Sequence, residues 1–108
     1  MLIHLDNEWF LKIKNRSKTI ELRLYDEKRR KINIGDIIEF ENRLDREIIK
    51  CRVIDLHIFK NFKELYENID NTKFGYDVNN ADYKDMEVFY SLEEQEKYGV
   101  VGIELELL

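Results

Sequence analysis

Lys18, Glu21 and Arg23 are the residues of this sequence whose types and spacing are best suited to chemistry. The stretch 19–24 alternates strictly between polar and apolar side chains, which predicts a β-strand with Thr19, Glu21 and Arg23 on one face. Arg23 would offer planar donors to a phosphate or a base edge, and Glu21 would accept an exocyclic amine or act as a general base. Lys18 would reach a phosphate or polarise a carbonyl oxygen. The alternative is a solvated strand face with a surface ion pair worth at most about 1 kcal/mol.

Positive charge is concentrated in one part of the chain. Residues 12–31 hold nine basic and three acidic side chains, a net charge of +6, so the rest of the chain carries −11 within a total of −5. A basic region on an acidic body can hold a phosphate backbone there. The predicted phosphate-contacting edge consists of Lys28, Arg29, Arg30 and Lys31. Tyr25 follows the charged strand and is the aromatic residue best placed to stack on a base. A solvated basic loop that only keeps the protein soluble is the competing interpretation.

The length and composition indicate one small domain over residues 1–108. Hydrophobic side chains make up 44% of the chain, which is enough for one core and argues against disorder. Cys51 is the single cysteine and is expected to be buried, and a reduced, cytoplasmic setting follows as the default. His4 and His57 are distant and lack the spacing of zinc ligands, so they are expected to be structural and no metal or other cofactor is predicted. No secretory signal is visible, no apolar run reaches the ~20 residues that span a bilayer, and no membrane partner is expected.

The apolar periodicity predicts a helix over residues 6–15, with Trp9 and Phe10 in the core. Further strands are predicted at 37–40, 47–59 and 101–107, and further helices at 61–69 and 92–98, the last of these capped by Ser91 with Glu94 and ended by Gly99. Apolar residues on both faces of 53–58 indicate a strand covered on both sides. The segment 70–86 is predicted as a loop or a loosely helical lid. Short strands separated by turns or single helices favour an α+β fold, a small mixed β-barrel flanked by short helices.

Two stretches of the chain resemble the ASCH domain family, named for activating signal cointegrator homology. Residues 13–40, IKNRSKTIELRLYDEKRRKINIGDIIEF, are similar to the family's signature of a small helix, a Lys-Thr-x-Glu-x-Arg strand, a basic stretch and Gly-Asp before a strand. Residues 89–108, FYSLEEQEKYGVVGIELELL, resemble the closing segment of small prokaryotic members. The resemblance implies a β-barrel like that of pseudouridine synthases and archaeosine transglycosylases (PUA-like), with a cleft, and RNA or nucleotide binding as its use.

One group of the family is similar in length and hydrolyses the acetyl amide of N4-acetylcytidine. In that group a Lys and a Thr lie on the motif strand, and a Glu lies farther along. Lys18 matches the Lys, but Glu21 stands where that group has Thr, so the hydroxyl nucleophile is missing here. Glu93 or Glu94 is a candidate for the second carboxylate.

Three hypotheses remain open at this point. The first is a binding module for RNA or a modified nucleotide, in which Arg23 and the basic edge hold phosphate while Lys18 and Glu21 read the base. The second is a small amidohydrolase acting on an acylated nucleobase, in which Lys18 polarises the carbonyl and Glu21 activates water. The third is a partner-binding domain that uses the acidic body and no nucleic acid. The sequence has no Ser-His-Asp set and no Gly-rich phosphate loop, which counts against the better-known enzyme classes. The oligomeric state is not predicted.

Overall fold

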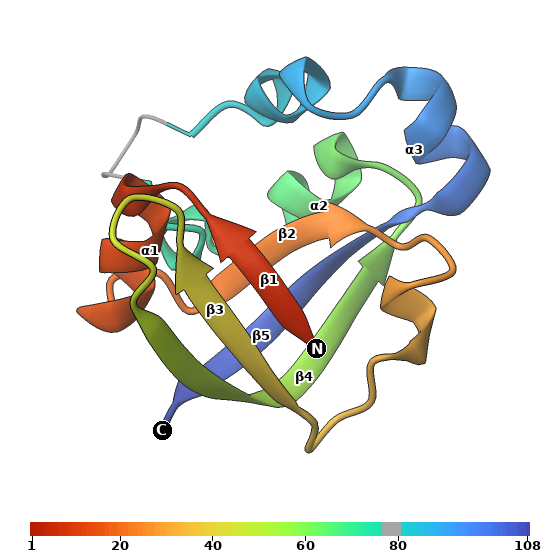
Figure 1. The fold of residues 1–108 in the computed structure, drawn as a ribbon. Coiled ribbons are helices and arrows are strands. Elements are labelled where there is room, and N and C mark those ends of the chain that lie inside the picture. The colour runs from red at the N-terminus through yellow and green to blue at the C-terminus, as the bar shows by residue number, and fades with distance from the viewer. Residues whose placement is uncertain (77–80) are drawn as a thin grey trace.

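Five strands form one curled sheet in this computed structural model, which describes residues 1–76 and 81–108 (Figure 1). The strands are β1 (Leu2–Leu5), β2 (Ile20–Leu24), β3 (Ile37–Asn42), β4 (Ile48–Phe59) and β5 (Val100–Leu107). Their order in the sheet is β1-β3-β4-β5-β2, with β1 parallel to β3 and every other pair of neighbours antiparallel. Because β1 and β2 stand at the two edges, the sheet is a half-barrel that is open between them.

Short helices surround this half-barrel. The α-helices are α1 (Asn7–Lys14), α2 (Phe62–Asn68) and α3 (Leu92–Tyr98), and the 3₁₀ turns are η1 (Arg29–Lys31), η2 (Asn71–Lys73) and η3 (Tyr83–Val88). In Figure 1, α2, η3 and α3 lie together above the sheet. Helix α1 follows β1 at the left of the view, and η1 lies on the β2–β3 connection at the right. No helix within the described residues is long and apolar enough to cross a membrane. The arrangement is the predicted α+β fold of short strands and short helices.

Two apolar clusters lie on opposite faces of β5, and this explains the alternation on β2. Val101, Ile103 and Leu105 face the interior of the half-barrel, whereas Val100 faces a second cluster under α2. The second cluster takes the apolar face of β2, namely Ile20, Leu22 and Leu24, together with Phe62, Leu65, Tyr66 and Phe74. Burial of these side chains removes apolar surface from water on both faces of the same strands. The polar face of β2, with Glu21 and Arg23, is thereby turned toward the concave side of the sheet.

Most predicted elements are present within a few residues of their predicted bounds. Helix α3 has the predicted capping box, in which the Ser91 side chain accepts from the Glu94 backbone and Glu94 caps Ser91 in return, and it ends at Gly99. Strand β1 was not predicted. Ile3 and Leu5 are buried while Leu2 and His4 are exposed, so the alternation exists, but it covers only four residues. The segment 70–86 contains η2 and the first part of η3, so it is loosely helical as predicted, although residues 77–80 lie outside the described part.

The prediction that residues 53–58 are covered on both sides is wrong. Val53 is fully buried, but Ile54 and Ile58 are 43% and 50% exposed. The register between β4 and β5 shifts between Val53 and Asp55, so Ile54 is the extra residue of a β-bulge. The bulge resets the alternation, so Val53 before it and Leu56 after it both face the interior although their positions differ in parity.

Candidate functional site

A cleft of about 380 Å³ lies between β1 and β2, the two edge strands of the half-barrel. One side is formed by the end of β1 and by Trp9 of α1, and the other by Lys18 and residues 21–23 of β2. Phe74, Tyr76 and the segment 85–90 complete its lining. The residues that the sequence predicts as a polar cluster therefore do line one cavity, and they meet there because the sheet stays open between β1 and β2.

Lys18 is buried in the wall of this cleft, 5% exposed, and its ammonium group is fully occupied by protein acceptors. Its Nζ donates to the carbonyl oxygens of Ile20 at 2.9 Å and Phe74 at 3.0 Å, and it lies 3.3 Å from Glu21 Oε1. An ammonium has three N–H donors, so none remains free for a ligand. Burial lowers the pKa of Lys18, and the charge of Glu21 offsets this only in part.

Gly75 is what allows the chain to approach Lys18 this closely. A Cβ on Gly75 would lie 3.2 Å from Lys18 Cβ and 3.3 Å from Lys12 Cδ, and the residue has φ +94°. Its carbonyl oxygen accepts from Lys12 Nζ at 2.7 Å. Residues 74 and 75 thus hold both lysines with main-chain oxygens, which a bulkier residue at position 75 would disturb.

Glu21 is an ionised carboxylate held between two cations. It is 6% exposed, and its Oε2 accepts from Arg23 Nε at 3.2 Å and from Nη2 at 2.9 Å, while Oε1 faces Lys18. Burial alone would raise the pKa of Glu21, but the charges of Lys18 and Arg23 together outweigh burial and lower the pKa below its usual value. A carboxylate with a lowered pKa is a weak general base, so the arrangement does not favour water activation by Glu21.

Arg23 is the member of the triad that remains available to a ligand. Glu21 engages only Nε and Nη2 of Arg23, and the side chain is 19% exposed at the cleft. Burial acts to lower the pKa of Arg23, but Glu21 and the neighbouring Tyr90 raise it overall, so its charge is secure. The clamp by Glu21 fixes the plane of the guanidinium before any ligand arrives, which reduces the entropy lost on binding.

Aromatic side chains form the apolar part of the cleft. Trp9 was predicted to be core, but it is only half-buried, because α1 turns it into the cavity, edge-on to Tyr76 at 6.2 Å between ring centroids. Phe10, by contrast, is fully buried as predicted. Tyr90 stacks on the buried Phe62 at 5.8 Å. Phe89 lines the same cavity and is 68% exposed.

A chain of hydroxyl groups ties η3 to the body of the protein. The hydroxyls of Tyr66 and Tyr76 are 3.0 Å apart, and Tyr76 donates to Asp85 Oδ2 at 3.2 Å. Burial raises the pKa of both tyrosines, so the phenols stay protonated. Tyr76 and Asp85 line the cleft, so this chain sets the position of its outer wall.

The free edge of β2 adds main-chain groups to the cleft. Leu105 N donates to Thr19 O at 2.8 Å, and Tyr25 N donates to Gly99 O at 3.0 Å. In an antiparallel ladder hydrogen-bonded residues alternate, so positions 19, 21, 23 and 25 pair with β5, and the N–H and C=O of Leu22 point to the open side. Leu22 lines the cleft, where it presents a donor and an acceptor side by side.

The predicted basic edge and Tyr25 lie outside this cavity. Arg29 pairs with Asp26 at 3.1 Å, and Arg30 donates to Tyr98 O at 2.9 Å while its guanidinium covers the Tyr25 ring at 4.4 Å. One face of Tyr25 is therefore already occupied. Lys28 and Lys31 are exposed, and none of these residues is among those that line the cleft.

The remaining candidates also lie elsewhere. Glu94 caps α3, and neither it nor Glu93 lines the cleft. Cys51 is buried as predicted, and burial raises the pKa of its thiol to about 11. His4 lies at the rim of the cleft, 3.4 Å from Glu41, whereas His57 lies on β4 outside it.

Sequence reasoning missed the outer wall of the cleft. Trp9, Tyr76, Asp85 and Phe89 line it, yet only the position of α1 and η3 relative to β2 makes them neighbours. The one available signal was the surplus of aromatic residues in a polar segment near Phe89.

Comparison with known proteins identifies close structural relatives. A family model described as "ASCH domain" matches residues 3–108. The structure of the hypothetical protein PH0355 is 36% identical, with a TM-score of 0.84, over 99% of this chain and 97% of that one. Protein PF0455 from Pyrococcus furiosus is 35% identical, with a TM-score of 0.73, over 100% and 98%. The ASCH protein from Zymomonas mobilis shares the fold at 14% identity, with a TM-score of 0.68, over 97% of this chain and 65% of that one. No curated protein matches at a significant level.

Proposed function

This chain belongs to the ASCH domain family, and we propose that its cleft binds a single unpaired nucleotide of RNA. The observation that carries the proposal is Arg23, a guanidinium fixed by Glu21 in the wall of a cavity whose other walls are aromatic. Arginine matches the oxygens of a phosphate or of a base edge. Aromatic rings accept the faces of unstacked bases.

The size and lining of the cleft favour one nucleotide over a duplex. A cavity of about 380 Å³ is in the usual range for small-molecule sites, and it opens between strands that a double helix cannot enter. Trp9 and Phe89 offer faces for stacking, and the adjacent N–H and C=O of Leu22 are complementary to a base edge that presents one acceptor and one donor. Arg23 then binds the phosphate or a base carbonyl.

The basic turn at η1 has a secondary role in this proposal. Lys28 and Lys31 are exposed, while the two arginines between them are engaged by the protein itself. The two lysines would contact the backbone of RNA that extends beyond the cleft. Such contacts add salt dependence but no sequence preference.

The amidohydrolase alternative rests on one observation, the lowered pKa of a lysine buried at the cleft. The same geometry opposes it, because the Lys18 donors are all occupied and Glu21 has a lowered pKa. We expect purified protein to leave N4-acetylcytidine unchanged when the mixture is analysed by chromatography. Hydrolysis by the wild type that is lost in Lys18→Met would make the amidohydrolase the favoured function in place of RNA binding.

Arg23→Met tests the proposal directly. Loss of a charge-assisted contact of about 1.5–3 kcal/mol predicts roughly 10- to 150-fold weaker binding of a short fluorescent single-stranded RNA, measured by anisotropy. Arg52→Met is the matched control, because Arg52 is 49% exposed on the convex side of β4, paired only loosely with Glu106 at 3.8 Å. We expect it to bind as the wild type does.

Arg23→Lys shows whether weaker RNA binding has a cause other than a loss of folding. It keeps the positive charge beside Glu21 but removes the planar fork, so affinity falls while the unfolding midpoint changes little. Equal RNA affinity in the wild type, Arg23→Met and Arg23→Lys would refute a binding role for this cleft.

A further inference from the structure

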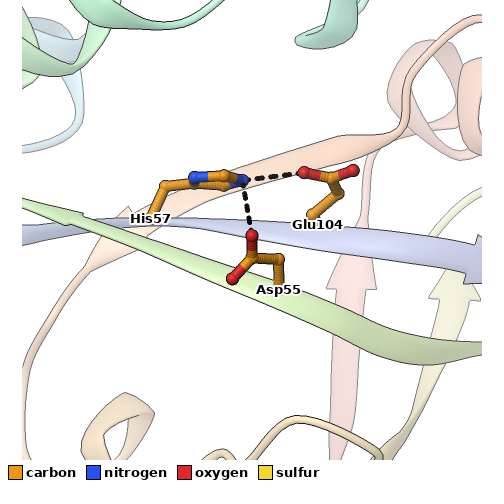
Figure 2. Close-up of side chains that lie close together, drawn as sticks. All are labelled: Asp55, His57 and Glu104. Carbon is orange, nitrogen blue, oxygen red and sulfur yellow. Dashed lines mark hydrogen bonds and ion pairs between the residues drawn. The ribbon is translucent and has the colours of Figure 1, made fainter.

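Asp55, His57 and Glu104 form a cluster on the outer face of β4 and β5, away from the cleft (Figure 2). Leu56 packs against the interior cluster, so its neighbours Asp55 and His57 point to the opposite face. Glu104 lies directly across from Asp55 in the register. The β-bulge at Ile54 creates this pairing, because without the extra residue Glu104 would lie opposite Ile54.

The three side chains converge on one point. His57 Nε2 lies 2.7 Å from Glu104 Oε1 and 3.7 Å from Asp55 Oδ2, and the three atoms are all within 4.8 Å of one another. Figure 2 shows the carboxylates of Asp55 and Glu104 both turned toward the same ring nitrogen. Gly102 lies beside His57 on the neighbouring strand, and a Cβ there would come within 3.1 Å of Ile20 Cγ2.

The charges at this position are unbalanced. Asp55 and Glu104 are like charges directly opposite each other in an antiparallel pair, an arrangement that destabilises a sheet. Within the described part of the chain, no Lys or Arg nitrogen lies within 4.0 Å of either carboxylate, and their only ion-pair partner is His57. A bound cation would remove this repulsion.

We propose that Asp55, His57 and Glu104 bind a divalent transition-metal ion of the Zn²⁺ or Co²⁺ class. Imidazole nitrogen with carboxylate oxygen is the donor set that these ions accept, whereas Mg²⁺ and Ca²⁺ prefer oxygen alone. Metal–ligand bonds of about 2.0–2.2 Å place neighbouring donor atoms roughly 3–3.5 Å apart, and the two distances from His57 bracket that range. The side chains are 53%, 27% and 24% exposed for Asp55, His57 and Glu104, so water completes the coordination.

The other histidine of the chain shows what distinguishes this cluster. His4 also lies near a carboxylate, Glu41, at 3.4 Å. Glu41, however, is already paired with Arg46 Nε at 2.6 Å, which supplies the positive charge, and no second carboxylate completes a triad there within the described residues. His4→Gln is therefore a natural control for His57→Gln. Cys51 does not compete for the ion, because it is buried and burial raises the pKa of its thiol to about 11.

The test is calorimetric titration of untagged protein with ZnCl₂, repeated on three variants. We expect one Zn²⁺ per chain in the wild type and in His4→Gln, and affinity lower by more than about tenfold in His57→Gln and Asp55→Asn. Asp55→Asn is the conservative variant, because its side-chain oxygen can still accept from Leu56 N as Asp55 Oδ1 does at 2.8 Å. Circular dichroism checks that each variant is folded, as expected for positions that are at least partly exposed.

Thermal unfolding without metal gives a second readout. Asp55→Asn removes one of two opposed charges, so its midpoint equals or exceeds that of the wild type without Zn²⁺ and rises less than that of the wild type when Zn²⁺ is added. Wild-type protein that binds no Zn²⁺, or a folded His57→Gln that binds it as tightly as the wild type, overturns the proposal.

Discussion

Glu21→Gln is expected to lower the free energy of unfolding by about 3–5 kcal/mol, because it leaves the buried Lys18 and the partly buried Arg23 facing each other without a counter-charge. Lys18 is 5% exposed, and the Arg23 side chain 19%, so water can replace the carboxylate only in part. Small domains have a total stability of about 5–15 kcal/mol, so the variant should fold but with little margin. Urea unfolding followed by tryptophan fluorescence measures the loss.

Glu106→Gln is the matched control for this experiment. It makes the same substitution on a carboxylate that is 57% exposed and 3.8 Å from Arg52, for which at most about 1 kcal/mol is expected. Equal losses in the two variants would mean that the interactions of Glu21 add no more to folding than those of a surface carboxylate.

The pH dependence of this effect has a definite sign. The pKa of Glu21 is lowered in the folded protein relative to the value of 4.5 expected without the fold. Its stabilising contribution is therefore complete above pH 4.5 and is lost as the pH falls through the lower folded-state pKa. The difference in unfolding free energy between wild type and Glu21→Gln should shrink below pH 4.5.

Lys18→Met is expected to be about as damaging as Glu21→Gln, at about 3–5 kcal/mol, for the complementary reason. Glu21 keeps Arg23 as a partner, but the carbonyl oxygens of Ile20 and Phe74 both lose their donor. A buried acceptor without a partner costs about 1–3 kcal/mol. The strand β2 and the turn at Phe74 are then no longer joined through the ammonium group.

The double variant Lys18→Met/Glu21→Gln separates the interaction energy between Lys18 and Glu21 from the other effects of each substitution. We expect it to be more stable than the sum of the two losses predicts, with a coupling energy of about 0.5–3 kcal/mol, because neither change then leaves the other group buried without its counter-charge. The same urea titrations supply the four free energies of the cycle. Strict additivity would show that the two groups do not interact.

The sequence alone was sufficient for the architecture and for part of the site. Strict alternation at 19–24 correctly placed Glu21 and Arg23 on one face of a strand, and the family resemblance supplied the barrel. Alternation could not reveal which polar groups form hydrogen bonds or ion pairs with one another. Lys18 was predicted to contact a ligand, yet its donors are occupied by Ile20, Phe74 and Glu21.

Other features depend on contacts distant in sequence, which periodicity and charge counting cannot reveal. The helical periodicity around Trp9 predicted a core residue, but the sheet is open between β1 and β2 beside α1, so Trp9 lines the cleft. Charge counting favoured the basic run near Arg30, whose partners are Tyr98 and Tyr25. The cluster at His57 depends on a one-residue bulge, which shifts register without leaving a clear mark in the sequence.

The open side of the half-barrel has a further consequence, for aggregation. Within the described residues, β2 has a strand partner on one side only, and the main-chain groups of its other side could template a strand from another molecule. Phe89 and Tyr90 of the segment that follows η3 line the same cleft as Leu22 and Arg23 of that edge strand. Phe89 and Tyr90, which line the proposed binding cleft, are therefore also expected to hinder strand pairing between β2 and another molecule. Shortening this segment should produce self-association as well as a wider cavity.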